Sequence, residues 1–157
     1  MKKYFILPLL LFTSYTLAQL DSLDNSYIEK LKEDVDEASK EIVSDNLELT
    51  ASEAKIFWPL YDQYMSARNP IVENRIMMAS EYLQNYPSMD DKTADVIINE
   101  LLQSELDLLN LKKDYIGKMS EVLPATLVGK YLQIENRIST LLDLVRMSSI
   151  PLLQKKE

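Results

Sequence analysis

Apolar side chains recur at steps of three and four along most of the chain, a spacing typical of amphipathic helices. This pattern predicts four helices, at about 26–45, 50–86, 91–122 and 125–148. The connections between them are short, so successive helices should fold back on one another. The sequence therefore predicts an all-α fold of two antiparallel helical hairpins.

The second predicted helix has the clearest start. Thr50 and Glu53 are spaced as a capping box, in which each side chain binds the backbone N–H of the other. The helix that follows places one small and three aromatic residues on a single stripe, which we expect to form the centre of the core: Ala54, Phe57, Tyr61 and Tyr64.

Two prolines fall inside this helix, at Pro59 and Pro70. A proline within a helix removes one backbone hydrogen bond and crowds the carbonyl four residues before it. We therefore predict a kink at each proline, with a bend or short break at Pro70.

The first and third predicted helices carry longer apolar seams. On the first helix the seam is Ile28, Leu31, Val35, Ala38 and Ile42. On the third it is Ala94, Ile98, Leu101, Glu105, Leu108, Lys112, Tyr115, Met119 and Val122. Steps of three and four in alternation are typical of coiled-coil packing, so we expect these residues to face their partner helices.

The turn at Leu123-Pro124 fixes which residues of the last two helices face each other, because their numbers sum to about 246 or 247. Lys112 then faces Glu135, and we predict a partly buried ion pair that sets the register; the alternative is that both point to solvent. Gly117 faces Gly129, which would allow the two helices a close approach.

The first eighteen residues match a secretory signal peptide rather than part of the fold. Lys2 and Lys3 precede an apolar run that ends in Thr16-Leu17-Ala18, so we expect cleavage after Ala18 and a single helical domain over 19–157. The alternative is an uncleaved membrane anchor, which the shortness of the run disfavours. After cleavage we expect no stable membrane insertion.

The mature chain would be strongly acidic. Without Lys2 and Lys3 it has 15 basic against 25 acidic residues, a formal net charge of −10. This balance disfavours nucleic acid and anionic lipid as partners, so we expect a protein partner.

The residue types that most enzymes use are scarce. The sequence has no Cys, no His and two Gly, which leaves no thiol or histidine catalysis, no usual zinc site and no phosphate-binding loop. We expect neither an enzyme nor a cofactor. The remaining candidate site is a partner-binding or client-binding surface around the single tryptophan, for which the alternative is a place in the core: Trp58, Leu60, Tyr61 and Tyr64.

Several apolar residues lie off the main stripes, and we expect them to support a homodimer: Trp58, Leu60, Ile97, Leu111 and Leu144.

The helix start Leu49-Thr50-Ala51-Ser52-Glu53 resembles the Leu-Thr-x-x-Gln motif of the periplasmic Spy/CpxP group. At the second copy, Leu123-Pro124-Ala125-Thr126-Leu127, Pro replaces Thr and Leu replaces Gln. The longer pattern is similar to a set of small exported bacterial proteins labelled sensors linked to extracytoplasmic-function sigma factors; it comprises Glu53-Ala54-x-x-Phe57-Trp58-Pro59-x-Tyr61-x-x-Tyr64, Tyr131–Arg137 and Ile150-Pro151-Leu152.

This resemblance implies a soluble periplasmic protein that acts as an ATP-independent chaperone or an envelope-stress sensor or adaptor. The alternative is a passive structural or interaction module of an envelope complex. Exposed apolar residues on the folded protein would favour the first function, and a fully polar surface the second.

Overall fold

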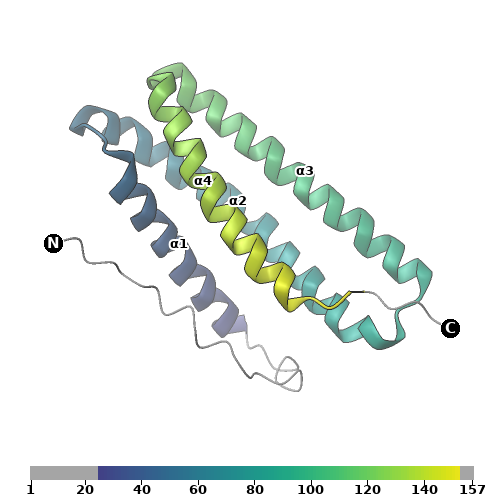
Figure 1. Cartoon of the computed structure of the whole chain (residues 1–157). Coiled ribbons are helices and arrows are strands. Elements are labelled where there is room, and N and C mark those ends of the chain that lie inside the picture. The colour runs from purple at the N-terminus through teal and green to yellow at the C-terminus, as the bar shows by residue number, and fades with distance from the viewer. Residues whose placement is uncertain (1–24, 153–157) are drawn as a thin grey trace. The chain divides into compact units, whose positions relative to one another are not determined.

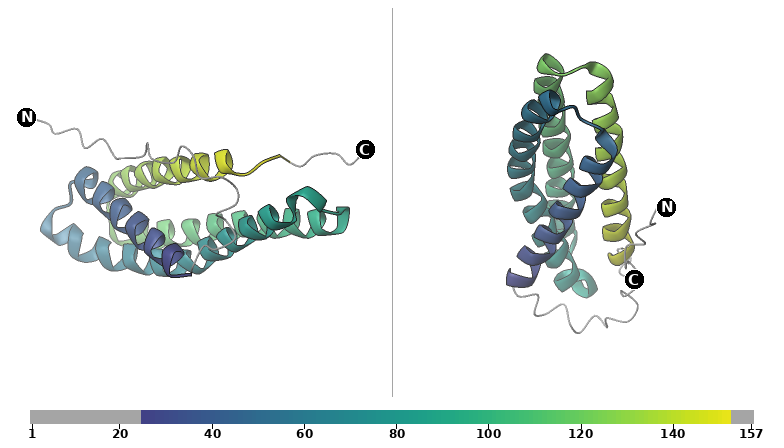
Figure 2. Two further views of the ribbon diagram at one scale, coloured as in Figure 1. Left: turned by 90° about the horizontal axis from the view of Figure 1, so that it is seen from below. Right: turned by 90° about the vertical axis from the view of Figure 1, so that its left-hand side faces the viewer.

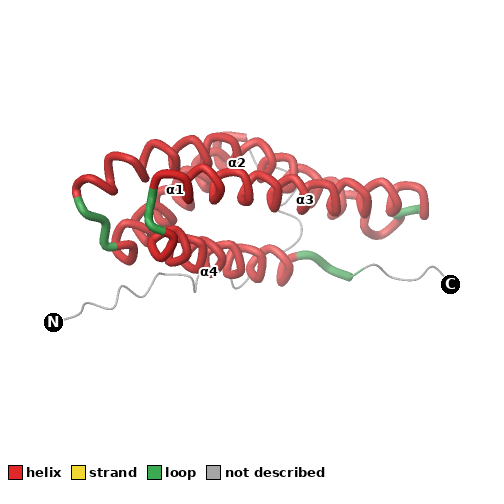
Figure 3. The backbone as a smooth tube through the Cα atoms, turned by 90° about the horizontal axis from the view of Figure 1, so that it is seen from above, coloured by secondary structure: helices red, strands yellow, loops and turns green. Residues whose placement is uncertain are grey.

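The computed structural model describes residues 25–152, and within them all regular structure is helical (Figure 3). The four α-helices are α1 (Asn25–Leu47), α2 (Ala51–Asn85), α3 (Asp91–Val122) and α4 (Ala125–Ser149). A short 3₁₀ turn, η2 (Tyr86–Ser88), joins α2 to α3. The predicted all-α fold of four helices is confirmed, with boundaries within about two residues of those expected.

The chain divides into two compact units, one up to Asp34 and one from Val35 onward, and the packing described below lies within the second. The expected signal peptide and the side chains of Ile28 and Leu31 fall outside the described residues. Within residues 25–152 no helix is long and apolar enough to cross a membrane.

The predicted capping box begins α2. The Thr50 N–H donates to Glu53 Oε2 at 2.9 Å, and the Glu53 N–H donates to Thr50 Oγ1 at 3.3 Å. The Thr50 hydroxyl also donates to Glu53 Oε2 at 2.6 Å, and this bond, with a smaller contribution from the Thr50 N–H, lowers the pKa of the Glu53 carboxyl. Asp90 caps α3 in a similar way, accepting from the Thr93 N–H at 2.8 Å.

Helix α2 continues through both of its prolines as one element of 35 residues. Of the bend or short break expected at Pro70, the break therefore does not occur. Pro59 is exposed, so its ring faces solvent. The proline carries no N–H, and the helix accommodates the missing backbone bond without ending.

The long helices α2 and α3 are joined by η2 and lie antiparallel, side by side over much of their length (Figures 1 and 2). Their backbones approach more extensively than those of α3 and α4. The closest packing thus joins the two expected hairpins to each other.

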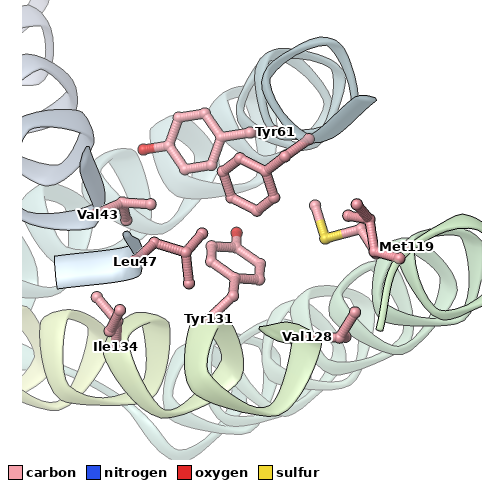
Figure 4. Close-up of a cluster of buried hydrophobic side chains, with 9 residues drawn as sticks. Val43, Leu47, Tyr61, Met119, Val128, Tyr131 and Ile134 are labelled. Carbon is pink, nitrogen blue, oxygen red and sulfur yellow. The ribbon is translucent and has the colours of Figure 1, made fainter. Parts of the chain in front are cut away.

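The main core lies where the α1–α2 and α3–α4 turns meet, and we call this the core end (Figure 4). Phe57 packs edge-to-face on Tyr131 with ring centroids 5.1 Å apart, and Tyr61 lies 5.9 Å from Phe57. The core comprises Val43, Leu47, Phe57, Tyr61, Met119, Leu123, Val128, Tyr131 and Ile134.

Helix α1 enters this core one position away from the expected seam. Val43 and Leu47 are almost fully buried, and Ser39 is buried one turn earlier, whereas the predicted Ile42 is 44% exposed. The predicted seam suits a helix with one neighbour. Because α1 contributes to a core that α2 and α4 also line, its buried face points between them.

The long seam predicted for α3 is correct from Leu108 to Met119 and wrong over most of the part before it. Met119 is buried and Leu108 and Tyr115 are half-buried, but Ile98, Leu101 and Val122 are exposed. The spacing of a seam does not show over what part of its length another helix covers it.

The expected close approach at the two glycines does not occur. A Cβ built at Gly117 or at Gly129 would meet no atom within 4 Å, and both residues are exposed. Counting residues away from a turn predicts which positions of two helices lie at the same height. It does not predict on which side of each helix a residue lies. Here both glycines lie on outer surfaces.

Candidate protein-binding surface

The aromatic stripe of α2 forms core rather than a binding surface, which corrects the prediction for two of its residues. Tyr61 and Tyr64 are each 3% exposed. Burial, with a smaller contribution from Asp36, raises the pKa of Tyr61 to about 12. Burial also raises the pKa of Tyr64, and the neighbouring Glu135 adds to the effect. Neither ring is available to a partner.

Trp58 and Leu60 are half-buried and pack against the same core. The indole meets Phe57 and Tyr61 edge-on, with centroid distances of 5.1 and 5.4 Å. On its outer side, Lys40 Nζ lies 5.5 Å from the indole centroid, within the range of a cation–π contact. Trp58 thus forms a second layer of the core, covered in part by a lysine.

The predicted pair of Lys112 and Glu135 is confirmed. Lys112 Nζ lies 2.5 Å from Glu135 Oε2, and the two side chains are 22% and 10% exposed. The other carboxylate oxygen, Oε1, accepts from the Tyr64 hydroxyl at 3.0 Å and from Ser139 Oγ at 2.9 Å. This network joins α2, α3 and α4 at the border of the core end.

The opposite end of the molecule, which we call the far end, includes η2 and the last turns of α4. A charged side chain lies in its interior. Arg75 Nη2 lies 3.6 Å from Glu105 Oε1, and its side chain is only 10% exposed. Burial lowers the pKa of Arg75, and nearby Arg146 adds to this effect. Tyr82 donates to the Pro151 carbonyl at 2.6 Å, which holds the chain after α4 against α2.

Large apolar side chains lie on the outer surface of the far end. In the second half of α4, Leu141, Leu144 and Met147 are 62%, 64% and 67% exposed, and Val145 is also exposed. We call these four residues the α4 apolar face. The charged residues between Ile138 and Ile150 are Asp143 and Arg146, which pair with each other at 2.8 Å. The α4 apolar face is therefore almost neutral.

A second set lies on α3. Four exposed residues follow one another at steps of four, four and three and so share one side of the helix: Ile98, Leu102, Leu106 and Leu109. We call them the α3 apolar face. Leu102 and Leu109 are 59% and 60% exposed.

The two faces were largely missed by the sequence patterns. Leu144 was expected to be off the seams and is exposed, but the other four residues expected to support a dimer are half-buried: Trp58, Leu60, Ile97 and Leu111. The exposed faces could have been predicted in part from the leucine-rich stretch of α3 between Ile97 and Leu111. Apolar residues lie on more sides of this stretch than two neighbouring helices can cover.

Among residues 25–152 no group of three or more acidic side chains is placed to hold a metal ion. Comparisons of the chain with protein-family models, with curated proteins and with solved structures give no match.

Proposed function

We propose that this chain is a non-enzymatic, exported protein of the bacterial periplasm that binds unfolded segments of other envelope proteins. It would act as an ATP-independent chaperone, or as an adaptor that reports envelope stress to a partner. The α4 apolar face is the observation that supports this function best. A passive module would be expected to have a polar outer surface, and this surface is not polar.

Three properties of the α4 apolar face suit a client-binding surface. Its side chains are more than half exposed at Leu141, Leu144 and Met147, so a client can bury much apolar area there. Its charges are few and paired, so it does not select a client by charge. Methionine is flexible and adapts to apolar groups of different shape.

Suppression of aggregation tests the proposal. An unrelated protein is unfolded in the presence of stoichiometric amounts of this chain, without ATP, and light scattering is followed. We expect scattering to fall several-fold with the wild-type chain. The double variant Leu141→Gln with Leu144→Gln should lose most of this effect while keeping its helical circular dichroism.

Ile56→Gln is the matched control, because Ile56 is an exposed apolar residue of α2 that belongs to neither face. Its variant should suppress aggregation as the wild type does. No suppression by the wild-type chain would favour the passive module. Equal suppression by the Leu141→Gln, Leu144→Gln variant would place the client elsewhere.

A further inference from the structure

The α3 apolar face has charged residues at its two ends, and they are of opposite sign. Asp95 and Asp91 lie one and two turns before Ile98, and Lys113 lies one turn after Leu109. Both aspartates and Lys113 are exposed. Steps of four, three, four, four, three and four place all seven residues on the same side of α3.

The seven positions are symmetric about Leu102, although the counterpart of the apolar Leu109 is Asp95. Ile98 and Leu106 lie four residues before and after it, and Asp91 and Lys113 lie eleven residues before and after it. If a second α3 lies antiparallel with its Leu102 opposite this one, each apolar side chain near the centre meets another apolar side chain. Each Asp91 then lies opposite Lys113 of the second copy.

We propose that the α3 apolar face is the site at which two copies of this chain associate, with their α3 helices antiparallel and Leu102 at the two-fold axis. A two-fold interface requires a surface that is complementary to itself. The α3 face meets this requirement at Ile98, Leu102 and Leu106 and in the charges at its two ends, but not at Leu109, which would lie opposite Asp95. The antiparallel arrangement also pairs the helix dipoles favourably. The parallel arrangement would place like charges together.

The contrast with α4 supports this choice of occupant. The two charged residues beside the α4 apolar face, Asp143 and Arg146, pair with each other. They therefore do not favour one orientation of a partner over another. The charges at the ends of the α3 face are spread over 22 residues, about 33 Å of helix. Complementary charges at that separation fix the partner and its direction more than they raise affinity. The proposal is independent of the client-binding function.

Sedimentation velocity at tens of micromolar protein and low ionic strength tests the proposal. We expect the wild-type chain to be a dimer. Leu102→Gln places two amides at the axis and should weaken the dimer at least tenfold. Leu144→Gln on α4 should not change the mass. Circular dichroism verifies that each variant remains helical.

Charge reversal tests the direction. Asp91→Lys alone and Lys113→Asp alone should each weaken the dimer. Residue 91 of each copy lies opposite residue 113 of the other, so each variant creates two pairs of like charge. A mixture of the two variants restores both pairs and should form heterodimers. Asp107→Lys is the matched control: it changes the net charge as Asp91→Lys does, but Asp107 lies on another side of α3.

A monomeric wild-type chain would overturn the proposal, and so would a dimer that Leu102→Gln leaves intact. Two single variants that fail to form heterodimers in the mixture would overturn the antiparallel arrangement. If Leu102→Gln abolished aggregation suppression without any change in mass, the face would bind clients instead of a second copy.

Discussion

The two ends of the molecule bury different kinds of side chain. At the core end, nine apolar residues from all four helices form one cluster, with the Phe57, Tyr61 and Tyr131 rings at its centre. At the far end, the buried residues among those described are Met78 and Ser104, and the charged side chain of Arg75 is only 10% exposed. Yet ten of the exposed large apolar residues lie on the far parts of α3 and α4: Val96, Ile98, Leu101, Leu102, Leu106, Leu109, Leu141, Leu144, Val145 and Met147.

This difference suggests that the stability of the fold and its association with partners depend on different ends of the molecule. Apolar area removed from water stabilises the fold in proportion to the area buried, and most of that burial is at the core end. Apolar area left on the surface does not stabilise the monomer and is available to partners. We therefore expect substitutions at the core end to change the free energy of unfolding, and substitutions on the two apolar faces to change association instead.

Phe57→Ala should have the largest effect on stability. The ring is almost fully buried and contacts three other aromatic rings, so its removal leaves a cavity and should cost about 3–5 kcal/mol. Leu144→Ala is the matched far-end change and should stay within about 0.5 kcal/mol. Urea unfolding followed by circular dichroism measures both; equal losses would remove the distinction between the two ends.

Alkaline pH should destabilise the core end. The folded-state pKa of Tyr61 is raised from 10.0 to about 12, so the neutral phenol's contribution is complete below pH 10 and is lost as the pH rises toward 12. Two pKa units correspond to ~3 kcal/mol. The pKa values of Tyr64 and Tyr131 are also raised, by burial first of all, and add in the same direction.

Urea unfolding at intervals from pH 9 to pH 12 measures this loss, and absorbance at 295 nm reports ionisation of the phenols. Tyr61→Phe should lose less stability than the wild type over this range. Tyr82→Phe is the far-end control. Burial also raises the pKa of Tyr82, but Tyr82 is only half-buried, so this change should reduce the alkaline loss of stability less than Tyr61→Phe does. A free energy of unfolding that stays constant up to pH 12 would contradict the burial of these hydroxyls.

The Lys112–Glu135 pair lies at the border between the two ends. Lys112→Met removes one charge and leaves the Glu135 carboxylate with its two hydroxyl donors, so we expect a loss of about 1–3 kcal/mol. Replacing Glu135 by Leu as well should recover only part of that loss, because the Tyr64 hydroxyl is then buried without a partner. Adding Tyr64→Phe should recover more. A coupling below about 0.5 kcal/mol in the double-mutant cycle would mean that the pair is not formed in solution.

Sequence patterns were sufficient where one local rule decided the structure. The Thr50–Glu53 capping box, the Asp90 cap and the aromatic stripe of α2 each depend on residues within a few turns. The Lys112–Glu135 pair followed from counting residues away from a single turn.

The patterns failed where the burial of a residue depended on how many helices pack against its own helix. The seam chosen on α1 contained Ile42 because its spacing suits one partner helix, whereas Val43 and Leu47 point between two. The same limit hid the two exposed apolar faces. The spacing of Leu102 and Leu144 does not say whether another helix covers them, because that depends on the positions of helices distant in sequence.

The smallest expected effect concerns a defect within the core end. The Tyr131 hydroxyl is buried and has no hydrogen-bond partner among the described residues, whereas the Tyr64 hydroxyl donates to Glu135. A buried polar group without a partner opposes folding. Tyr131→Phe should therefore be neutral or stabilise the chain by up to about 1 kcal/mol, while Tyr64→Phe should destabilise it by about 1 kcal/mol. Both variants keep the ring and remove one oxygen, so urea unfolding compares the two hydroxyls directly. If both substitutions cost the same, the Tyr131 hydroxyl has a partner in solution, such as a buried water, and the core end is more polar than its apolar cluster indicates.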